Sequence, residues 1–393
     1  MIWASHAVRG ANAAEMIRHL ADEIRPAFGN HAIDLAVFFV SPHFRDTFDQ
    51  LPAMLQEHLP VRVQIGCSAG GVVGGGIELE NEAAMSLTAA HLPHVKIHPI
   101  ASDTENVPDA DAPPDVWKNW LGIPGLANAH FIILADPFTA RLDPVLTGLD
   151  YIFPDGVKIG GLASGARSEG GNVLYLNSRT YRRGLVAVAL TGNIAIDTIV
   201  AQGCRPIGEP IAITACQHNI LQGVNGVTPL HYLGSLIERL SEYDRALMKT
   251  SLFLGLAVDP FVALPGRGDY LIRNLVGIDY QTGVLAVNAL LREGQIVQFH
   301  LRDRATSAED LDALLRAQAA RTRTPAHGAL LFQCIGRGRY LYGESGHDSR
   351  QFATRLGPVP IGGFFCNGEI GQVGGATHLH GYTSSFGIFR PAT

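Results

Sequence analysis

The chain has 393 residues, more than one ordinary hydrophobic core accommodates, so two domains are expected. Its 47% hydrophobic and 17% charged residues indicate a well-packed globular protein and exclude a disordered or fibrous one. A net charge of −6 gives no electrostatic reason to bind nucleic acid or an anionic lipid surface. The longest apolar runs, 35–40 and 185–190, fall far short of the roughly 20 residues of a transmembrane helix. We therefore expect a cytoplasmic protein with neither a nucleic-acid nor a membrane partner.

The first half of the chain predicts two βαβ units. In each unit a buried strand (34–40 or 131–135) is followed by a helix and then by a second strand that leads into a glycine-rich turn. The Pro- and Asp-rich segment 102–115 is expected to be a surface loop. The predicted helices are 11–26, 41–58 and 144–151, and the predicted strands are 34–40, 61–65, 83–90, 95–100, 131–135, 157–159, 172–176 and 185–190.

In the second half, Thr228 and Pro229 predict the start of a helix that continues to Leu240. Ser307–Asp310 resembles a capping box and predicts that another helix begins there. The predicted strands are 253–258, 271–278, 284–290, 298–303 and 328–333. Domains over 1–215 and 216–393 are expected, either adjacent or intertwined.

Three segments share the order Ile-Gly, small residue, polar turn, Gly-Gly: Gln64–Gly76, Lys158–Gly171 and Pro360–Gly375. Glycine permits close approach of the backbone, so such turns can present N–H groups to an anionic ligand. The alternative is that the glycines only allow tight turns between packed strands. We expect the three turns to meet at one site. The fold class is therefore α/β with two domains, mixed and largely buried sheets, and internal pseudo-repeats with glycine-rich turns at strand ends.

The five cysteines are an odd number without paired spacing, which favours a reducing compartment over a disulfide framework. Cys67, Cys334 and Cys366 each lie in or beside a glycine-rich turn.

Several short motifs in order give the chain a resemblance to the FIST family of sensory proteins over nearly its whole length. They are Ile65–Gly71 (IGCSAGG), Gly203–Gly208 (GCRPIG), Arg273–Asp279 (RNLVGID), Phe299–Asp303 (FHLRD), Phe332–Gly338 (FQCIGRG), and Phe364–Gly371 (FFCNGEIG) with His380–Ser384 (HGYTS). The resemblance implies FIST N- and C-terminal domains that form an intracellular small-ligand sensor, with amino-acid-like ligands proposed for the family. The sequence shows no attached kinase, transducer or cyclase segment, so a separate signalling protein is the expected partner.

Our main hypothesis is an amino-acid-like or small carboxylate ligand held between the glycine-rich turns. Backbone N–H groups of the turns would hold its oxygens, Arg337 or Arg273 would neutralise its carboxylate, and Glu369 or Asp279 would take an ammonium group. The residues expected to contact the ligand are Cys67, Ser68, Gly70, Ser164, Arg273, Asp279, Arg337, Cys366, Asn367, Glu369, His380 and Tyr382.

Three alternatives remain open. A thiol enzyme would use Cys366 or Cys334 as the nucleophile with His380 or His300 as the base. One branch of the FIST family is described as a haem-binding nitric-oxide sensor, and non-covalent haem would need one axial histidine, for which His231, His300 and His380 are available. Metal binding by His378, His380 and Cys366 lacks an obvious fourth ligand, so neither a metal nor a cofactor is part of the main hypothesis.

Overall fold

The computed structural model describes residues 1–259, 265–266, 268–321 and 324–392. The chain forms two compact units, Met1–Val200 with Asp312–Thr393, and Ala201–Leu311. The expected α/β class and two-domain organisation are confirmed. The units do not follow the linear division after residue 215, because the last part of the chain returns to the first unit.

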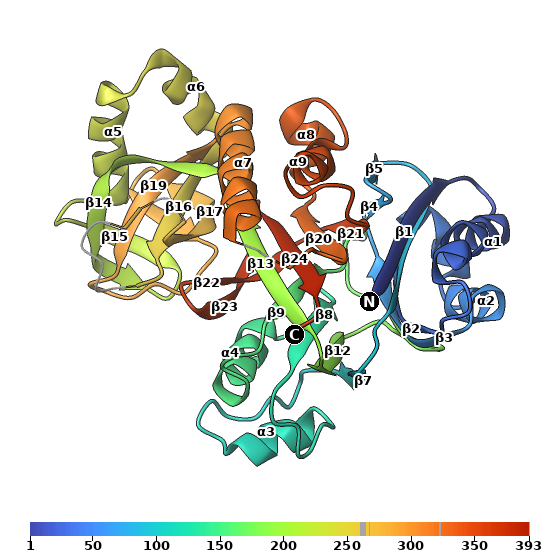
Figure 1. Ribbon diagram of the computed structural model, residues 1–393. Helices are drawn as coiled ribbons and strands as arrows, with labels where there is room; N and C mark the ends of the chain where they lie inside the picture. Colours follow the sequence, from blue (N-terminus) through green and yellow to red (C-terminus); the bar gives the residue numbers. More distant parts are fainter. Residues whose placement is uncertain (260–264, 267, 322–323, 393) are drawn as a thin grey trace. The chain divides into compact units, whose positions relative to one another are not determined.

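The first unit contains three six-stranded sheets with the same arrangement of strands (Figure 1). The first sheet has the order β1 (Ile2–Arg9), β6 (Ala84–His91), β2 (Ile33–Val40), β3 (Val61–Ser68), β10 (Leu174–Leu176) and β11 (Arg179–Tyr181). The second has the order β7 (Val95–Ser102), β12 (Leu185–Gly192), β8 (His130–Ala135), β9 (Lys158–Leu162), β22 (Glu369–Val373) and β23 (Ala376–His380). The third has the order β13 (Ala195–Ala201), β24 (Ser384–Arg390), β20 (Gly328–Cys334), β21 (Ile361–Cys366), β4 (Gly71–Gly74) and β5 (Ile77–Glu80).

Each sheet is built on one parallel pair of strands, and the three pairs are β2–β3, β8–β9 and β20–β21. The hairpin that follows each pair in the chain joins a different sheet: β4–β5 the third, β10–β11 the first, and β22–β23 the second. This exchange makes the three repeats intertwined. It also brings the three glycine-rich turns together, because each turn carries the chain from one sheet to the next.

Alternation along the central strands separates two kinds of core. The inner faces of all three sheets pack together in one hydrophobic cluster. It contains Val37 and Phe39 of β2, Ile132 and Leu134 of β8, and Leu330 and Phe332 of β20. The alternate residues of β2 and β8 pack instead against helices. The third sheet is covered by a helix as well, because Phe352 stacks on Phe386 with 5.5 Å between ring centroids.

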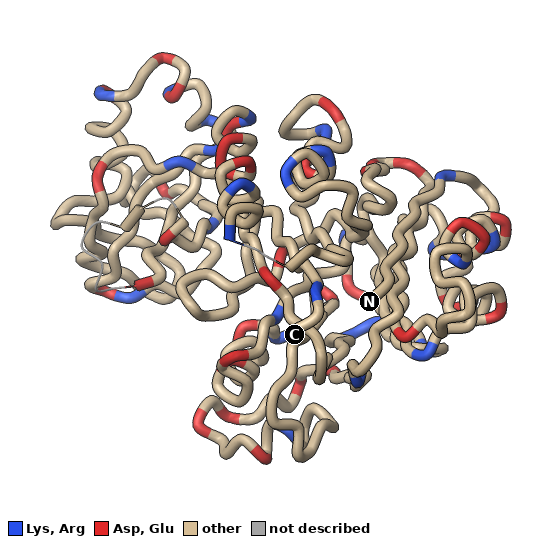
Figure 2. The backbone as a smooth tube through the Cα atoms, in the orientation of Figure 1, with Lys and Arg blue, Asp and Glu red and all other residues tan. Residues whose placement is uncertain are grey.

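The helices of the first unit are α1 (Ala13–Ile24), η1 (Arg25–Phe28), η2 (Pro42–Thr47), α2 (Leu51–His58), α3 (Pro114–Trp120), α4 (Leu142–Ile152), α8 (Gly338–Tyr342) and α9 (His347–Leu356). In Figure 2 the charged residues gather on helices and loops, while the central strands carry few. No helix in the described part of the chain is long and apolar enough to cross a membrane.

One glycine in each parallel pair lies where a side chain cannot fit. A Cβ atom at Gly66, Gly160 or Gly363 would lie 1.9, 1.8 or 1.8 Å from the carbonyl oxygen of the residue opposite on the neighbouring strand. These glycines are therefore needed for close approach of strands, a structural role other than the tight turns considered above. The third copy is shifted by one residue, because Gly363, not Gly362, is the equivalent of Gly66.

The second unit is a closed barrel of antiparallel strands around a separate core. Its strands are β14 (Cys204–Gln217), β15 (Ile220–Val224), β18 (Val284–Val287), β17 (Tyr270–Asp279), β16 (Leu252–Ala257) and β19 (Ile296–Arg302). Two helices of this unit, α5 (Pro229–Arg239) and α6 (Glu242–Ser251), begin after Thr228 and Ser241, whose side chains accept backbone N–H groups.

The predicted capping box at Ser307–Asp310 is wrong. The helix α7 (Arg304–Arg321) begins earlier, and Asp303 accepts the Thr306 N–H at 2.8 Å. Ser307 instead donates its hydroxyl to the carbonyl of Gly203, and Asp310 accepts the Gly203 N–H. The two side chains that suggested a local cap therefore make tertiary hydrogen bonds instead.

Candidate functional site

The three glycine-rich turns meet at Ser164. Its hydroxyl accepts the Gly70 N–H at 2.7 Å and donates to the carbonyl of Phe365, so it joins the first turn to the third. The Ser164 N–H donates to the carbonyl of Ser68 at 3.1 Å, and the Asn367 side chain donates to the carbonyl of Ala163 at 3.1 Å. The structure thus brings together Ser68, Gly70, Ser164 and Asn367, although their polar groups bond largely to one another.

The two cysteines expected at this junction are fully buried. Cys67 lies in the common core and burial raises the pKa of its thiol. Burial also raises the pKa of the Cys366 thiol, which donates to the carbonyl of Gln333 at 3.4 Å and lies 3.5 Å from Oε1 of Glu369. A nucleophile that attacks a substrate from solution needs an accessible thiolate, so this burial disfavours Cys366 as the nucleophile of a thiol enzyme.

Glu369 is also buried, at the start of β22. Its Oε2 accepts both the backbone N–H and the hydroxyl of Thr383, at 3.0 and 2.8 Å. Burial raises the pKa of Glu369 to about 7, against the lowering effect of these hydrogen bonds. The carboxyl group therefore carries a proton for part of the time at neutral pH.

Arg337 forms a closed network instead of facing a ligand. Its guanidinium is 0% exposed, bonds Asp348 through Nε at 2.8 Å, and donates to the hydroxyl of Tyr342 at 2.6 Å. Burial alone would raise the pKa of Asp348, but the charge of Arg337 holds it well below its usual range. The expected role of Arg337 in neutralising a ligand is not supported by this arrangement, because its charge is already paired.

The remaining predicted residues are distributed over both units. Arg273 and Asp279 belong to β17 of the barrel, where the Asp279 carboxylate accepts the hydroxyl and backbone N–H groups of the following turn. Hydrogen bonding by the Thr282 hydroxyl lowers the pKa of Asp279. In the first unit, the ring of His380 bonds the carbonyl of Gly371, and the carbonyl of Tyr382 accepts from Arg337 at 3.4 Å.

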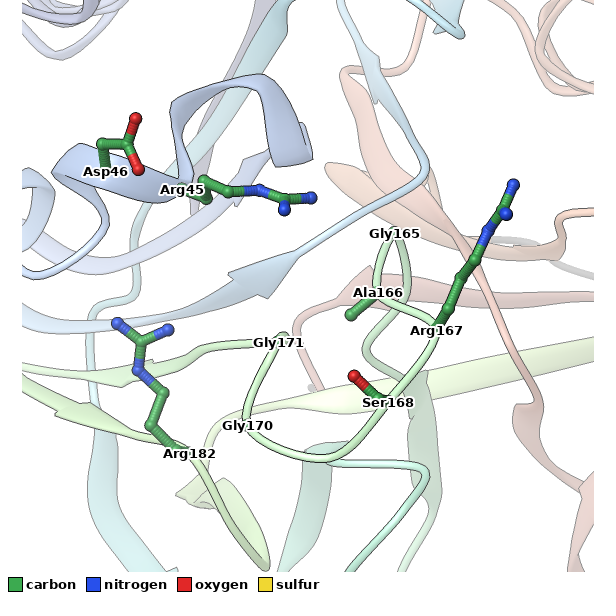
Figure 3. Close-up of a pocket in the computed structure, with 9 residues that line it drawn as sticks. All are labelled: Arg45, Asp46, Gly165, Ala166, Arg167, Ser168, Gly170, Gly171 and Arg182. Atoms are coloured by element: carbon green, nitrogen blue, oxygen red, sulfur yellow. The ribbon is translucent and has the colours of Figure 1, made fainter.

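A hollow of about 440 Å³ opens beside the second glycine-rich turn (Figure 3). We call it the arginine hollow. Arg45 and Asp46 reach it from η2, Arg182 from just after β11, and the loop between β9 and β10 forms the opposite wall. Its lining is Arg45, Asp46, Gly165, Ala166, Arg167, Ser168, Gly170, Gly171 and Arg182.

Two guanidinium groups point into the arginine hollow. In Figure 3, Arg45 and Arg182 extend into the space between η2 and the loop, whereas Arg167 extends away from it. Arg182 pairs with the exposed Asp49 at 2.8 Å, and Arg45 makes no ion pair with any residue the structure describes. The hydroxyl of Ser168 faces the same space. These groups suit a small oxyanion, because guanidinium binds carboxylate oxygens with well-directed N–H groups.

The buried Asn172 holds the loop that forms the wall through hydrogen bonds. Its side-chain oxygen accepts the Ala166 N–H and the Ser68 hydroxyl, both at 3.2 Å, and its amide group donates to Asp136 at 3.3 Å. On the outer side, Arg183 pairs with Glu169 at 3.4 Å. The wall of the hollow is therefore connected to the ends of β3 and β8.

Sequence reasoning missed Arg45, Arg167 and Arg182. The signal that could have found the hollow is the length of the second turn. Two residues connect β3 to β4 and two connect β21 to β22, but residues 163–173 separate β9 from β10. Only the second repeat carries an extension, and this extension forms the wall of the hollow.

The metal and haem alternatives gain no support from the geometry. Within the described residues, no group of three His, Cys, Asp or Glu side chains is arranged to hold a metal ion. His300 is buried in the barrel with its Nδ1 3.0 Å from the carbonyl of Gln298, burial lowers its pKa to about 4, and His231 lies on the surface helix α5. No histidine lines the arginine hollow, so the residues there do not fit an axially ligated haem.

The comparisons with known proteins agree with the motif resemblance. Residues 34–227 match the FIST N domain and residues 230–372 match the FIST C domain. The uncharacterised protein Rv0628c of Mycobacterium tuberculosis (strain ATCC 25618 / H37Rv) is 34% identical over 96% of this chain and 95% of its own length. The uncharacterised protein Mb0898c of Mycobacterium bovis is 33% identical over 94% of each chain. A cyanuric acid hydrolase from A. caulinodans aligns over 100% of this chain and 99% of its own, with 10% identity and a TM-score of 0.35. The chain therefore belongs to the FIST family, whose domains are in general small-ligand sensory domains.

Proposed function

We propose that this protein is a sensor whose ligand, a small carboxylate or amino-acid-like molecule, binds in the arginine hollow. The observation that carries the proposal is the extension of one turn out of three equivalent turns. The first and third repeats are completed by two-residue connections, so the fold itself does not require a connection as long as 163–173. The extension forms one wall of a space of about 440 Å³, within the usual range of about 300–1,000 Å³ for small-molecule sites.

The charges of the arginine hollow define how the ligand would be held. Arg45 and Arg182 take the carboxylate, and the Ser168 hydroxyl and the backbone of the glycine-rich loop donate further hydrogen bonds. Asp46, which also lines the hollow, is the acceptor for an ammonium group. This assignment moves the charge-neutralising role from Arg337 and Arg273 to side chains that line an open space.

The connection through Asn172 gives the sensor a route for its signal. A ligand that contacts the loop favours one arrangement of residues 165–171, and Ala166 transmits the change to Asn172 and hence to Ser68. Ser164, the residue before this loop, bonds both other turns. A separate signalling protein is the proposed partner that responds to this change.

The test is a thermal-shift screen followed by calorimetric titration. The panel contains acetate, succinate, neutral and acidic amino acids, the corresponding amines, and inorganic phosphate. A carboxylate that binds the folded state raises the midpoint of unfolding. Arg45→Gln and Arg182→Gln are each expected to weaken binding about tenfold to a hundredfold, the usual effect of removing a charged hydrogen bond.

The matched control is Arg179→Gln. Arg179 is an exposed residue of β11, three positions before Arg182, and it does not line the hollow. Equal binding by the control and loss of binding in the two hollow variants support the proposal. No shift with any carboxylate, or binding that survives both hollow substitutions, contradicts it.

A further inference from the structure

We propose that Cys334 and Cys366 form a redox site, a pair of thiols that a hydroperoxide converts into a disulfide joining β20 to β21. The inference does not depend on the ligand or on the arginine hollow. It rests on the register of the third sheet and on the charged groups that surround the two sulfur atoms.

The two cysteines are direct partners in the parallel pair of strands. Cys334 lies opposite Cys366 at the last position of β20 and β21. Neighbouring strands lie about 4.8 Å apart, and disulfides form between Cα atoms about 4.4–6.8 Å apart. Register partners on adjacent strands direct their side chains to the same face of the sheet. The backbone positions therefore already fall within the range of a disulfide.

No other pair of described cysteines has this relationship. Cys67 lies opposite Phe39 on one side and Leu174 on the other, Cys204 lies opposite Arg302, and Cys216 lies opposite Leu221. All five cysteines are reduced in the structure. A selective reaction between Cys334 and Cys366 would thus follow from position alone.

The surroundings give the two thiols different roles. Cys334 is 7% exposed and next to the exposed Ile335, whereas Cys366 is 0% exposed. The Cys334 sulfur accepts the Gly336 N–H at 3.4 Å, and it lies close enough to the Arg337 guanidinium for their charges to interact. The hydrogen bond favours the thiolate, and the Arg337 guanidinium, whose charge Asp348 also balances, adds to this effect. Cys334 is therefore the thiol that meets the oxidant.

In the first step, the Cys334 thiolate attacks one oxygen of the hydroperoxide. A sulfur–oxygen bond forms, the oxygen–oxygen bond breaks, and the leaving alkoxide or hydroxide takes a proton from water. The sulfur loses two electrons to the peroxide and becomes a sulfenic acid. The site is narrow, because Cys366 packs against Gly161, where a Cβ atom would lie 3.0 Å from its sulfur.

In the second step, the Cys366 thiol gives its proton to the Glu369 carboxylate, whose Oε1 lies 3.5 Å from the sulfur. The Cys366 sulfur then attacks the Cys334 sulfur, so the sulfur–sulfur bond forms and the sulfur–oxygen bond breaks. The departing hydroxide takes up a proton and leaves as water. Overall, two thiols and one hydroperoxide give one disulfide, one water and one alcohol, or a second water when the oxidant is hydrogen peroxide.

The test treats the reduced, full-length protein with hydrogen peroxide and maps its peptides by mass spectrometry. The expected product is a single cross-link between the peptides of Cys334 and Cys366, with the loss of two hydrogen masses and full reversal by dithiothreitol. Cys334→Ser abolishes the cross-link. Cys204→Ser, which removes a buried cysteine of the barrel, leaves the cross-link intact and serves as the matched control.

Glu369→Gln separates the two steps. It is expected to slow formation of the cross-link about tenfold or more, the range for loss of a general base. Trapping of the Cys334 sulfenic acid by dimedone should proceed at the wild-type rate and give a larger yield. A purely structural role for Glu369 would change both rates together.

Two results overturn the inference, and both come from the wild-type protein, so they do not depend on whether a variant folds. One is oxidation of Cys334 to the sulfinic acid with Cys366 still reduced. The other is oxidation at the partly exposed Cys216 while Cys334 and Cys366 both remain thiols.

Discussion

The second and third glycine-rich turns occupy equivalent places in the fold, yet the charged side chains near them differ in exposure. The second turn continues into a loop that faces the arginine hollow, where Arg45 and Arg182 remain accessible. The third turn is a two-residue connection, and the charges near it, Arg337, Asp348 and Glu369, are fully buried. The same residue type therefore serves stability in one repeat and is available for binding in another.

The physical reason is desolvation. A buried guanidinium must have its charge and its N–H groups satisfied by the protein, since no water replaces a lost partner. Arg337 meets this condition with Asp348, Tyr342 and the carbonyl of Tyr382. Arg45, which is exposed, keeps its hydration. A comparison of substitutions in the two repeats can therefore test the assignment of roles.

The largest effect is expected from Arg337→Met. The substitution leaves the Asp348 carboxylate buried without its cation, and breaking a buried pair in this way costs about 3–5 kcal/mol. Urea unfolding at pH 7 would measure the loss. The control is Arg350→Met, which removes an exposed pair with Glu344 and should cost less than about 1 kcal/mol. Equal losses in the two variants would show that the Arg337 network is not a stabilising element.

Gly66→Ala should have the next largest effect, since it tests the glycine shared by the three repeats. The added methyl group would lie 1.9 Å from the carbonyl oxygen of Phe38, a backbone atom that can move only with its strand. Overpacking of this kind costs about 1–3 kcal/mol or more. Thermal unfolding with Gly381→Ala as the control would measure it, because a Cβ atom at Gly381 meets no other atom within 4 Å. A stable Gly66→Ala variant would mean that the glycine serves ligand binding and not strand packing.

Glu369→Gln tests the buried acid of the third turn through pH. The pKa of Glu369 is raised to about 7 from an ordinary value of 4.5, so the folded state binds the proton more tightly than the unfolded state. The stability that Glu369 contributes to the folded state is therefore fully present below pH 4.5 and is lost as pH rises through 7. The variant should keep, between pH 5 and 8, up to about 3 kcal/mol of stability that the wild type loses.

This prediction depends on the groups that face Glu369. They are the thiol of Cys366 on β21, Thr383 before β24, His380 opposite on β23, and the charge of Arg337. Urea unfolding at several pH values would follow the difference between variant and wild type. Glu57→Gln, on the exposed side of α2, should leave the pH profile unchanged. Parallel profiles for Glu369→Gln and wild type would contradict the raised pKa.

The sequence predicts the first two repeats better than the third, and the reason is local. The apolar strands 34–40 and 131–135 and the helices after them are strongly patterned, and they appear as β2, η2 with α2, β8 and α4. The helix α9 of the third repeat is polar, with Phe352 among its few buried residues, so no apolar periodicity announced it. The third βαβ unit was therefore missed although its glycine-rich turn was recognised.

The candidate site, too, could be predicted only in part from the sequence. The convergence of the turns was predicted from their shared pattern, and the structure places Ser68, Gly70, Ser164 and Asn367 together. Whether an arginine is buried cannot be read from its neighbours in sequence. Arg337 was expected to neutralise a ligand carboxylate, but its guanidinium is buried and pairs with Asp348 of α9. Arg45 and Arg182 gave no local signal, because the exchange of β10–β11 between sheets is what brings them to one hollow.

The smallest change in stability is expected from Arg45→Gln, and this outcome completes the comparison. Arg45 is exposed, with one weak hydrogen bond from Nε to the carbonyl of Pro42 at 3.5 Å, so the free energy of unfolding should change by no more than about 0.5 kcal/mol. Urea unfolding without added carboxylate would measure this change. In the presence of a binding carboxylate, the wild type should gain stability that the variant does not gain. A loss of stability in Arg45→Gln as large as that in Arg337→Met would place both arginines in the framework of the fold and remove the distinction between the two turns.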